Sequence, residues 1–121
     1  MKKKTVKVVE NVVIRSLDGT ESSDVQARID TGAGVSSIDV KLAAQLKLGP
    51  ISSYKKVRSA NGETLRPIVE AKLVISGEEY SQKFTVANRS SMKYKVLIGR
   101  DLLEQGFTVD TTEDIVKEDE R

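Results

Sequence analysis

The sequence contains no cysteine and no histidine. The absence of cysteine excludes disulfides and leaves the redox compartment unspecified. The absence of histidine excludes Ser-His-Asp triads, histidine general bases and the zinc sites that use imidazole ligands. The side chains left for chemistry are therefore carboxylates, hydroxyls, lysine and tyrosine.

Long apolar runs and phosphate-binding loops are also missing. No stretch approaches the ~18 apolar residues of a membrane span, and no G-x-x-x-x-G-K-[ST] loop is present to bind the phosphates of ATP. The net charge of +2 is too small to indicate binding to nucleic acid. No apolar segment of signal-peptide length follows the basic residues 1–4, so we expect a cytoplasmic protein with no cofactor, no metal and no membrane partner.

Aromatic residues make up only 4% of the 121 positions, and the core should therefore consist of valine, isoleucine and leucine, which favour sheets. We predict a mainly β chain that forms one domain over residues 1–121, with one or two short helices and flexible tails at about 1–4 and 113–121. Apolar patterning and turn signals predict strands at 5–14, 23–29, 35–38, 54–60, 63–75, 80–87, 95–98 and 107–111, and helices at 40–48 and 100–105. Asp18-Gly19 is a hairpin signal between the first two strands, and Asp39 is a suitable N-cap for the first helix.

One stretch, residues 28–38, indicates a catalytic site. Residues 25–30 alternate between apolar and polar as a strand with one buried face does. Asp30 ends that strand where Gly32 and Gly34 let the backbone turn sharply, which is how a carboxylate is presented to a cleft. Two carboxylates that share one proton can activate water for peptide hydrolysis, and this chain holds a single Asp-Thr-Gly.

Asp30-Thr31-Gly32-Ala33 resembles the active-site loop of aspartic proteases, and Val96-Leu97-Ile98-Gly99-Arg100 resembles the glycine element that passes beside this loop in retropepsins. Together with residues 88–94, these motifs are similar to the RimB-like group, whose members are labelled ATP-dependent zinc proteases and accompany the glutamate ligase RimK. The sequence supports neither the zinc nor the ATP of that label. The resemblance implies a retropepsin-like closed β-barrel, one half of an acid protease, and a homodimer in which each subunit contributes Asp30.

The resemblance also implies roles for single residues. Asp30 would activate the water, Thr31 would brace the two loops across the dimer, and the amide of Gly32 would approach the carboxylates or the substrate. The hairpin tip at 60–63 would be a flap that closes over bound peptide, and its Asn-Gly dipeptide is a strong hairpin signal. The residues expected to contact substrate are Ala33, Gly34, Ala60, Asn61, Gly62, Arg58 and Arg100.

The sequence departs from the retropepsin pattern at Gly34. Many retropepsins carry an acidic residue there that pairs with the arginine of the C-terminal helix element, and RimB-like chains commonly carry arginine. Here that helix arginine, Arg100, is left to pair with Asp101 or another carboxylate, or to face the cleft.

Around the expected flap, the basic residues Lys55, Lys56, Arg58 and Arg66 outnumber the acidic Glu63, and Arg28 and Arg100 flank the two motifs. If these cations face the cleft, they favour an acidic peptide. The RimB-like resemblance likewise implies glutamate-rich tails as substrate. The alternative is that the same side chains are solvated on an exposed hairpin.

Three functions remain open from the sequence. The first is a homodimeric aspartic endopeptidase. The second is a monomeric hydrolase in which Asp30 works with another acid, for which Asp39, Glu63 and Asp101 are the candidates. The third is a catalytically silent domain that binds peptides or dimerises a complex, against which the intact Asp-Thr-Gly-Ala argues.

Overall fold

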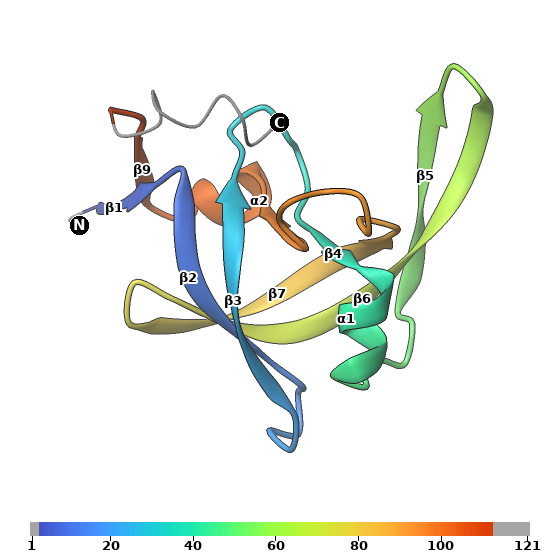
Figure 1. Ribbon diagram of the computed structural model, residues 1–121, viewed down its shortest axis with the longest axis horizontal. Helices are drawn as coiled ribbons and strands as arrows, with labels where there is room; N and C mark the ends of the chain where they lie inside the picture. The colour runs from blue at the N-terminus through green and yellow to red at the C-terminus, as the bar shows by residue number, and fades with distance from the viewer. Residues whose placement is uncertain (1–2, 113–121) are drawn as a thin grey trace.

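Six strands close into a barrel in the computed structural model, which describes residues 3–112 (Figure 1). The sheet has the order β2-β3-β8-β4-β7-β6-β5, and a further pairing of β2 with β6 closes the ring, leaving β5 attached outside it. The strands are β2 (Val9–Arg15), β3 (Ser22–Ile29), β4 (Ser37–Asp39), β5 (Ser53–Ser59), β6 (Gly62–Ile75), β7 (Glu78–Ala87) and β8 (Val96–Ile98). The predicted mainly β barrel is confirmed.

The first and last strands form a separate sheet. β1 (Lys4–Lys7) pairs in parallel with β9 (Phe107–Asp110). The strand predicted over 5–14 is therefore two strands, β1 and β2, divided at Val8. Of the predicted tails, 1–2 and 113–121 lie outside the described residues, and Lys4 begins β1.

The barrel interior is aliphatic, as predicted. Alternate residues of each long strand are buried, so that one face of the strand fills the core. Each fully buried valine, leucine or isoleucine contributes roughly 1.5–3 kcal/mol relative to an exposed one. The largest side chains with no more than 1% exposure are Phe84, Ile14, Ile38, Leu73, Ile75, Ile98 and Leu102.

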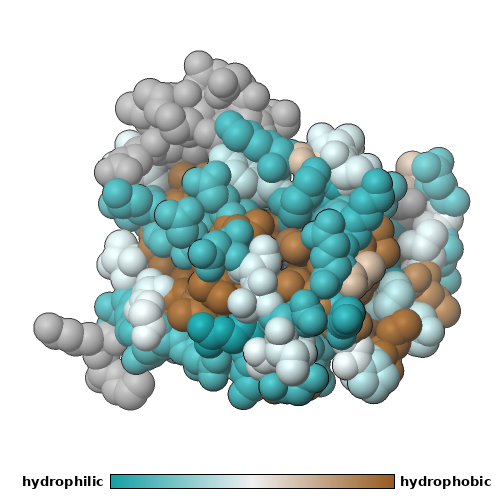
Figure 2. Space-filling model, turned by 60° about the horizontal axis from the view of Figure 1, so that its bottom comes forward, coloured by the Kyte–Doolittle hydropathy of each residue, from teal (hydrophilic) through white to brown (hydrophobic). Residues whose placement is uncertain are grey.

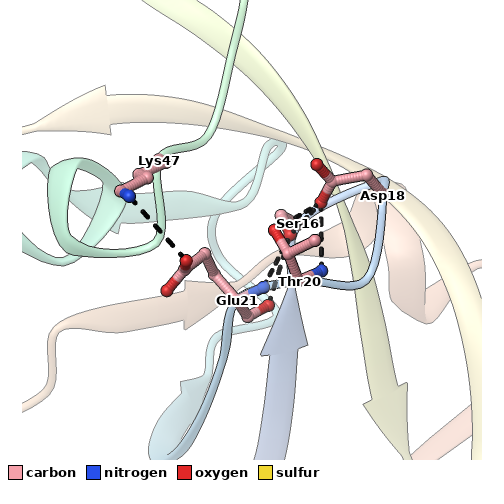
Figure 3. Close-up of polar contacts among 5 residues, drawn as sticks. All are labelled: Ser16, Asp18, Thr20, Glu21 and Lys47. Carbon is pink, nitrogen blue, oxygen red and sulfur yellow. Dashed lines mark hydrogen bonds and ion pairs between the residues drawn. The ribbon is translucent and has the colours of Figure 1, made fainter.

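The turn between β2 and β3 is fixed by its own polar side chains (Figure 3). The Asp18 carboxylate accepts hydrogen bonds from the Thr20 N–H at 3.0 Å, the Thr20 hydroxyl at 2.9 Å and the Ser16 hydroxyl at 2.7 Å. These bonds, led by the Thr20 N–H, lower the pKa of Asp18. Glu21 also forms an ion pair with Lys47 at 3.9 Å. The predicted hairpin is thus confirmed, and its second strand, β3, leads to Asp30.

Helix α1 (Val40–Gln45) begins where the sequence predicts, because the Asp39 carboxylate caps it by accepting the Lys41 N–H at 3.0 Å. It ends earlier than predicted. Lys47 adopts a left-handed φ of 54°, its N–H bonds to the Ala44 carbonyl, and the Leu48 N–H bonds to the Ala43 carbonyl. This is a Schellman ending, with lysine in the place usually taken by glycine.

Asp39 also ties the helix to a distant loop, because its other carboxylate oxygen accepts the Arg89 N–H at 2.7 Å. Burial raises the pKa of this carboxyl, but the N–H groups of Arg89 and Lys41 hold the anion and bring the net pKa below its ordinary value. Its stabilising contribution is therefore complete above the unfolded pKa of about 3.9 and is lost as the pH falls through the lower folded value.

Replacing Asp39 by alanine should lower the free energy of unfolding by about 2–3 kcal/mol at neutral pH, since both N–H groups lose a charged acceptor. Urea denaturation would measure the change. Asp24→Ala, at an exposed position of β3, is the control and should shift stability by no more than about 0.5 kcal/mol. Equal effects of the two substitutions would contradict the assigned role of Asp39.

The outer surface is mixed in character. Apolar side chains lie in separate groups between hydrophilic ones on the face that Figure 2 shows. Among the described residues, no helix has the length and apolar composition that crossing a membrane requires.

Candidate active site

The chain leaves the barrel at Asp30 in a tight loop. β3 pairs in parallel with β8, and the Asp30 N–H continues this pairing by donating to the Ile98 carbonyl at 2.9 Å. Beyond that point the Gly32 N–H donates to the Asp30 carboxylate at 2.8 Å, and the Ala33 N–H donates to the Asp30 carbonyl at 3.2 Å. The half-buried carboxylate is therefore oriented by a loop amide.

The glycine element packs directly against this loop. A Cβ atom at Gly99 would lie 2.7 Å from the Val35 carbonyl oxygen and 2.8 Å from that of Ala33, so only glycine fits there. The Arg100 N–H donates to the Ala33 carbonyl at 2.8 Å, and the Gly99 N–H donates to the Ser36 hydroxyl oxygen at 3.0 Å. The two sequence motifs thus form one rigid unit.

Arg100, the first residue of helix α2 (Arg100–Leu103), binds the loop through a carbonyl. Its Nη1 donates to the Thr31 carbonyl oxygen at 2.9 Å, and a Cβ atom at Gly34 would lie 3.5 Å from its Nη2. The guanidinium therefore lies over Gly34. Thr31, Gly32 and Gly34 are exposed and Ala33 is half-buried.

Asp101 belongs to a different network beneath the loop. Its carboxylate accepts the Ser36 N–H at 3.0 Å and the Ser36 hydroxyl at 2.7 Å. It also accepts the Gln82 amide at 3.0 Å and the Leu102 N–H at 2.9 Å. Four donors from the loop, β7 and α2 thus converge on one anion, which fixes the end of the Asp30 loop.

The expected flap is a long hairpin of β5 and β6 that projects from the barrel (Figure 1). Ala60 and Asn61 form its turn, and Gly62, with φ of 108°, begins β6. Arg58 donates to Glu63 at 2.8 Å. Since paired residues of a hairpin share a face, Arg58 and Glu63 lie on one face, whereas Arg66, paired with Lys55, lies on the other.

A pocket of about 240 Å³ opens beside Asp30, and no other residue predicted for the site lines it. The sequence analysis counted Arg28 among the cations that would favour an acidic peptide if they faced the cleft, and it assigned no role to Arg89. The available signal was that Arg28 precedes Asp30 by two positions on one strand and so shares its face. Besides Asp30, the pocket is lined by Arg28, Arg89, Ser91, Met92, Lys93, Tyr94 and Leu97.

The loop of residues 88–94, which forms one wall of this pocket, is fastened by charged groups. Asp39 holds the Arg89 N–H, and Arg89 Nε donates to the Tyr94 carbonyl at 3.0 Å. Lys95 Nζ donates at 2.9–3.0 Å to the carbonyl oxygens of Arg89, Ser90 and Met92. The pocket wall is therefore held in place by hydrogen bonds within the protein itself.

Comparison with known families identifies the chain. The family described as "Retropepsin-like aspartic endopeptidase RimB" matches residues 42–120. The chain belongs to this RimB-like family. The matched residues include the β5–β6 hairpin, the 88–94 loop and the glycine element, and they begin after the Asp30 loop.

Solved structures show the same fold for this RimB-like chain. EIAV protease in complex with the inhibitor HBY-793 has a TM-score of 0.61 at 19% identity, covering 80% of this chain and 85% of that one. The protease of simian foamy virus (mac) has a TM-score of 0.58 at 14% identity, covering 79% and 91%. Lpg0085, a Legionella pneumophila protein of unknown function, has a TM-score of 0.61 at 19% identity, covering 89% and 93%. The retropepsin-like fold is confirmed.

The RimB-like chain also matches part of larger proteins. Proteins named probable alpha-L-glutamate ligase from Shewanella pealeana and Shewanella halifaxensis are each 28% identical over 114 residues. The match covers 74% of this chain and 25% of each ligase, so the chain spans about a quarter of the length of these relatives.

The acids considered as partners of Asp30 within one RimB-like chain are engaged elsewhere. Asp39 caps α1, Asp101 binds Ser36, and Glu63 pairs with Arg58. Within residues 3–112, no group of three or more acidic residues is arranged to hold a metal ion.

Proposed function

We propose that this RimB-like chain is an aspartic endopeptidase that acts as a homodimer and prefers acidic or glutamate-rich peptides. The observation that carries the proposal is the geometry of the Asp30 loop. Its half-buried carboxylate accepts the Gly32 N–H, and the loop backbone packs tightly against Gly99. Asp30 in each subunit would supply one of the two carboxylates that the reaction requires.

The chemistry follows from bringing two like charges together. Two carboxylates a few ångströms apart cannot both ionise easily, so the pair holds one proton at working pH. The ionised Asp30 acts as general base on a water molecule, and the protonated one hydrogen-bonds to the scissile carbonyl. The proton taken from the water is later delivered to the leaving amine. The Gly32 N–H keeps each carboxylate in position throughout.

The surface around β1 and β9 supports the proposed dimer. Within residues 3–112 these strands form a two-stranded sheet, so each strand pairs with the other along one edge and its second edge has no partner strand in that sheet. A hollow between this sheet and the catalytic loop contains the apolar Leu103, Phe107 and Val109 next to Thr31 and Arg100. An isologous contact here would bring the two Asp30 loops toward one axis, with Thr31 at the contact.

Cations and the named relatives support an acidic substrate. Arg28, Arg89 and Lys93 line the pocket beside Asp30, and guanidinium groups bind carboxylates strongly. The relatives named glutamate ligases point to the same class of peptide, because a ligase forms the kind of bond that a peptidase cleaves. We place the acidic preference in this pocket, since Arg58 is paired with Glu63.

Dilution tests the dimer and the peptidase together. Sedimentation at high concentration should give twice the chain mass of 13.3 kDa. Below the dissociation constant, peptide cleavage per chain should fall about tenfold for each tenfold dilution, because only the dimer holds a complete site. Cleavage per chain that stays constant while the protein sediments as a monomer would instead establish the monomeric hydrolase, and a dimer that cleaves no peptide would establish the silent domain.

A further inference from the structure

A lysine ammonium group lies where three backbone carbonyl groups of the 88–94 loop converge. Lys95 Nζ donates to the carbonyl oxygens of Arg89, Ser90 and Met92 at 3.0, 2.9 and 3.0 Å. An ammonium group has three donors, so these bonds use all of them. Carbonyl oxygens that point to one place repel one another, and proteins use such clusters to bind cations. The loop is therefore folded around a positive charge that the chain itself supplies.

The backbone of Arg89 joins this ammonium group to a carboxylate. The Arg89 N–H donates to the Asp39 carboxylate at 2.7 Å, and the Arg89 carbonyl accepts Lys95 Nζ. The Asp39 N–H in turn donates to the Lys95 carbonyl at 2.8 Å. Burial raises the pKa of Asp39, whereas the N–H groups of Arg89 and Lys41 and the charge of Lys95 lower it. The three residues Asp39, Arg89 and Lys95 thus form a closed ring of hydrogen bonds in which two opposite charges stabilise each other.

The ring and the pocket lie on different sides of the loop. Asp39 and Lys95 line a second hollow of about 380 Å³, whereas Arg89 and Tyr94 line the pocket beside Asp30. Among the described residues, the linings of the two spaces have no member in common. Lys95 can therefore act on the pocket through the loop backbone and not by touching a ligand there.

We propose that Lys95 is a positioning residue, whose ammonium group holds the 88–94 loop in the form that walls the pocket, as a bound cation would. Without this charge the convergent carbonyls should turn toward water, so that the wall is formed only part of the time. The apparent dissociation constant of a pocket ligand then rises by the inverse of the fraction that stays formed. The Asp30 loop is held separately by Gly99 and Arg100. The kinetic part of this inference rests on the proposed peptidase.

Chemical rescue of a truncated side chain tests the inference. Lys95→Ala should raise KM for an acidic peptide at least about tenfold and leave kcat within about threefold of the wild-type value, because binding is weakened and the Asp30 loop is not. Added n-propylammonium replaces the missing carbons and charge, and it should return KM to within about threefold of the wild type. The uncharged 1-propanol should not restore KM, and neither compound should change KM of the wild type.

Two further variants control the interpretation. Lys41→Met removes a positive charge from an exposed residue that lines the same hollow as Lys95, and it should leave KM and kcat within about twofold of the wild type. Lys95→Met keeps an unbranched stem and replaces the alanine variant if that variant is unstable, with the same expected rise in KM. An unchanged KM in both Lys95 variants, or a rise in KM of Lys95→Ala that n-propylammonium and 1-propanol relieve equally, would overturn the inference.

Amide hydrogen exchange separates this inference from the proposed function, because it requires no cleavage. The Arg89 N–H and the Met92 N–H, which is bonded to the Arg89 carbonyl, should exchange at least about tenfold faster in Lys95→Ala, and n-propylammonium should reverse the change. The Asp30 N–H, bonded to the Ile98 carbonyl, should keep its rate. This pattern in a protein that cleaves no peptide would support the positioning role and contradict the peptidase. Unchanged exchange would contradict the positioning role whether or not the protein cleaves peptide, and cleavage alone decides the peptidase.

Discussion

Asp30→Asn should lower peptide cleavage at least about 10³-fold, since both halves of the general acid and base pair are lost at once in a homodimer. The measurement is kcat for an acidic peptide under conditions in which the wild type is dimeric. An asparagine at this position cannot take a proton from water at neutral pH. Turnover that persists would place the chemistry at another residue.

The fold should not change in this variant. The asparagine side chain keeps an oxygen that can accept the Gly32 N–H now bonded at 2.8 Å. We therefore expect an unchanged sedimentation mass and a free energy of unfolding within about 0.5 kcal/mol of the wild type. A loss of activity accompanied by unfolding would leave the assigned catalytic role unsupported.

Gly99→Ala should destabilise the protein by about 3 kcal/mol and lower the activity of the folded fraction about 100-fold. The new Cβ would lie 2.7–2.8 Å from backbone atoms of Val35 and Ala33, which cannot move without displacing the Asp30 loop. The backbone of Gly99 is extended, with φ of −104°, so the effect is steric and not conformational. Urea denaturation and kcat for an acidic peptide would measure the two changes.

Gly34→Ala is the matched control, since it adds the same methyl group to the same loop. Its Cβ would lie 3.5 Å from Arg100 Nη2, an ordinary contact with the end of a flexible side chain. Stability should change by no more than about 0.5 kcal/mol. Equal effects at positions 34 and 99 would contradict the close backbone approach.

Local elements of this fold could be predicted because their causes are local. The Asp18-Gly19 turn and the Asp39 cap depend on neighbours a few residues away, and both are confirmed. The predicted end of the first helix was wrong. Helix α1 ends at Gln45, because Lys47 adopts the left-handed conformation that closes it. Sequence patterns associate that conformation with glycine, so they placed the end near Gly49.

Contacts between distant segments were expected only where the family resemblance implied them. It placed residues 96–100 beside the Asp30 loop, and the pairing of β3 with β8 agrees with that, but the register that sets Leu97 opposite Arg28 comes from the fold. Arg89 is 61 positions from Arg28, so no spacing rule brings the two to one pocket. The flap illustrates the same limit, because alternation separates Arg58 from Arg66 into two faces but does not say which face meets the cleft.

The fastening of the 88–94 loop has a consequence for design. Asp39 and Lys95 bind this segment through its backbone N–H and carbonyl groups. Every residue has a backbone carbonyl, and every residue except proline has a backbone N–H. The exposed side chains at Ser91, Met92 and Lys93 can therefore be substituted without removing the hydrogen bonds that Asp39 and Lys95 make to the loop backbone. The barrel holds the Asp30 loop in place, and we expect substitutions in this short segment to change which ligands the adjoining pocket accepts.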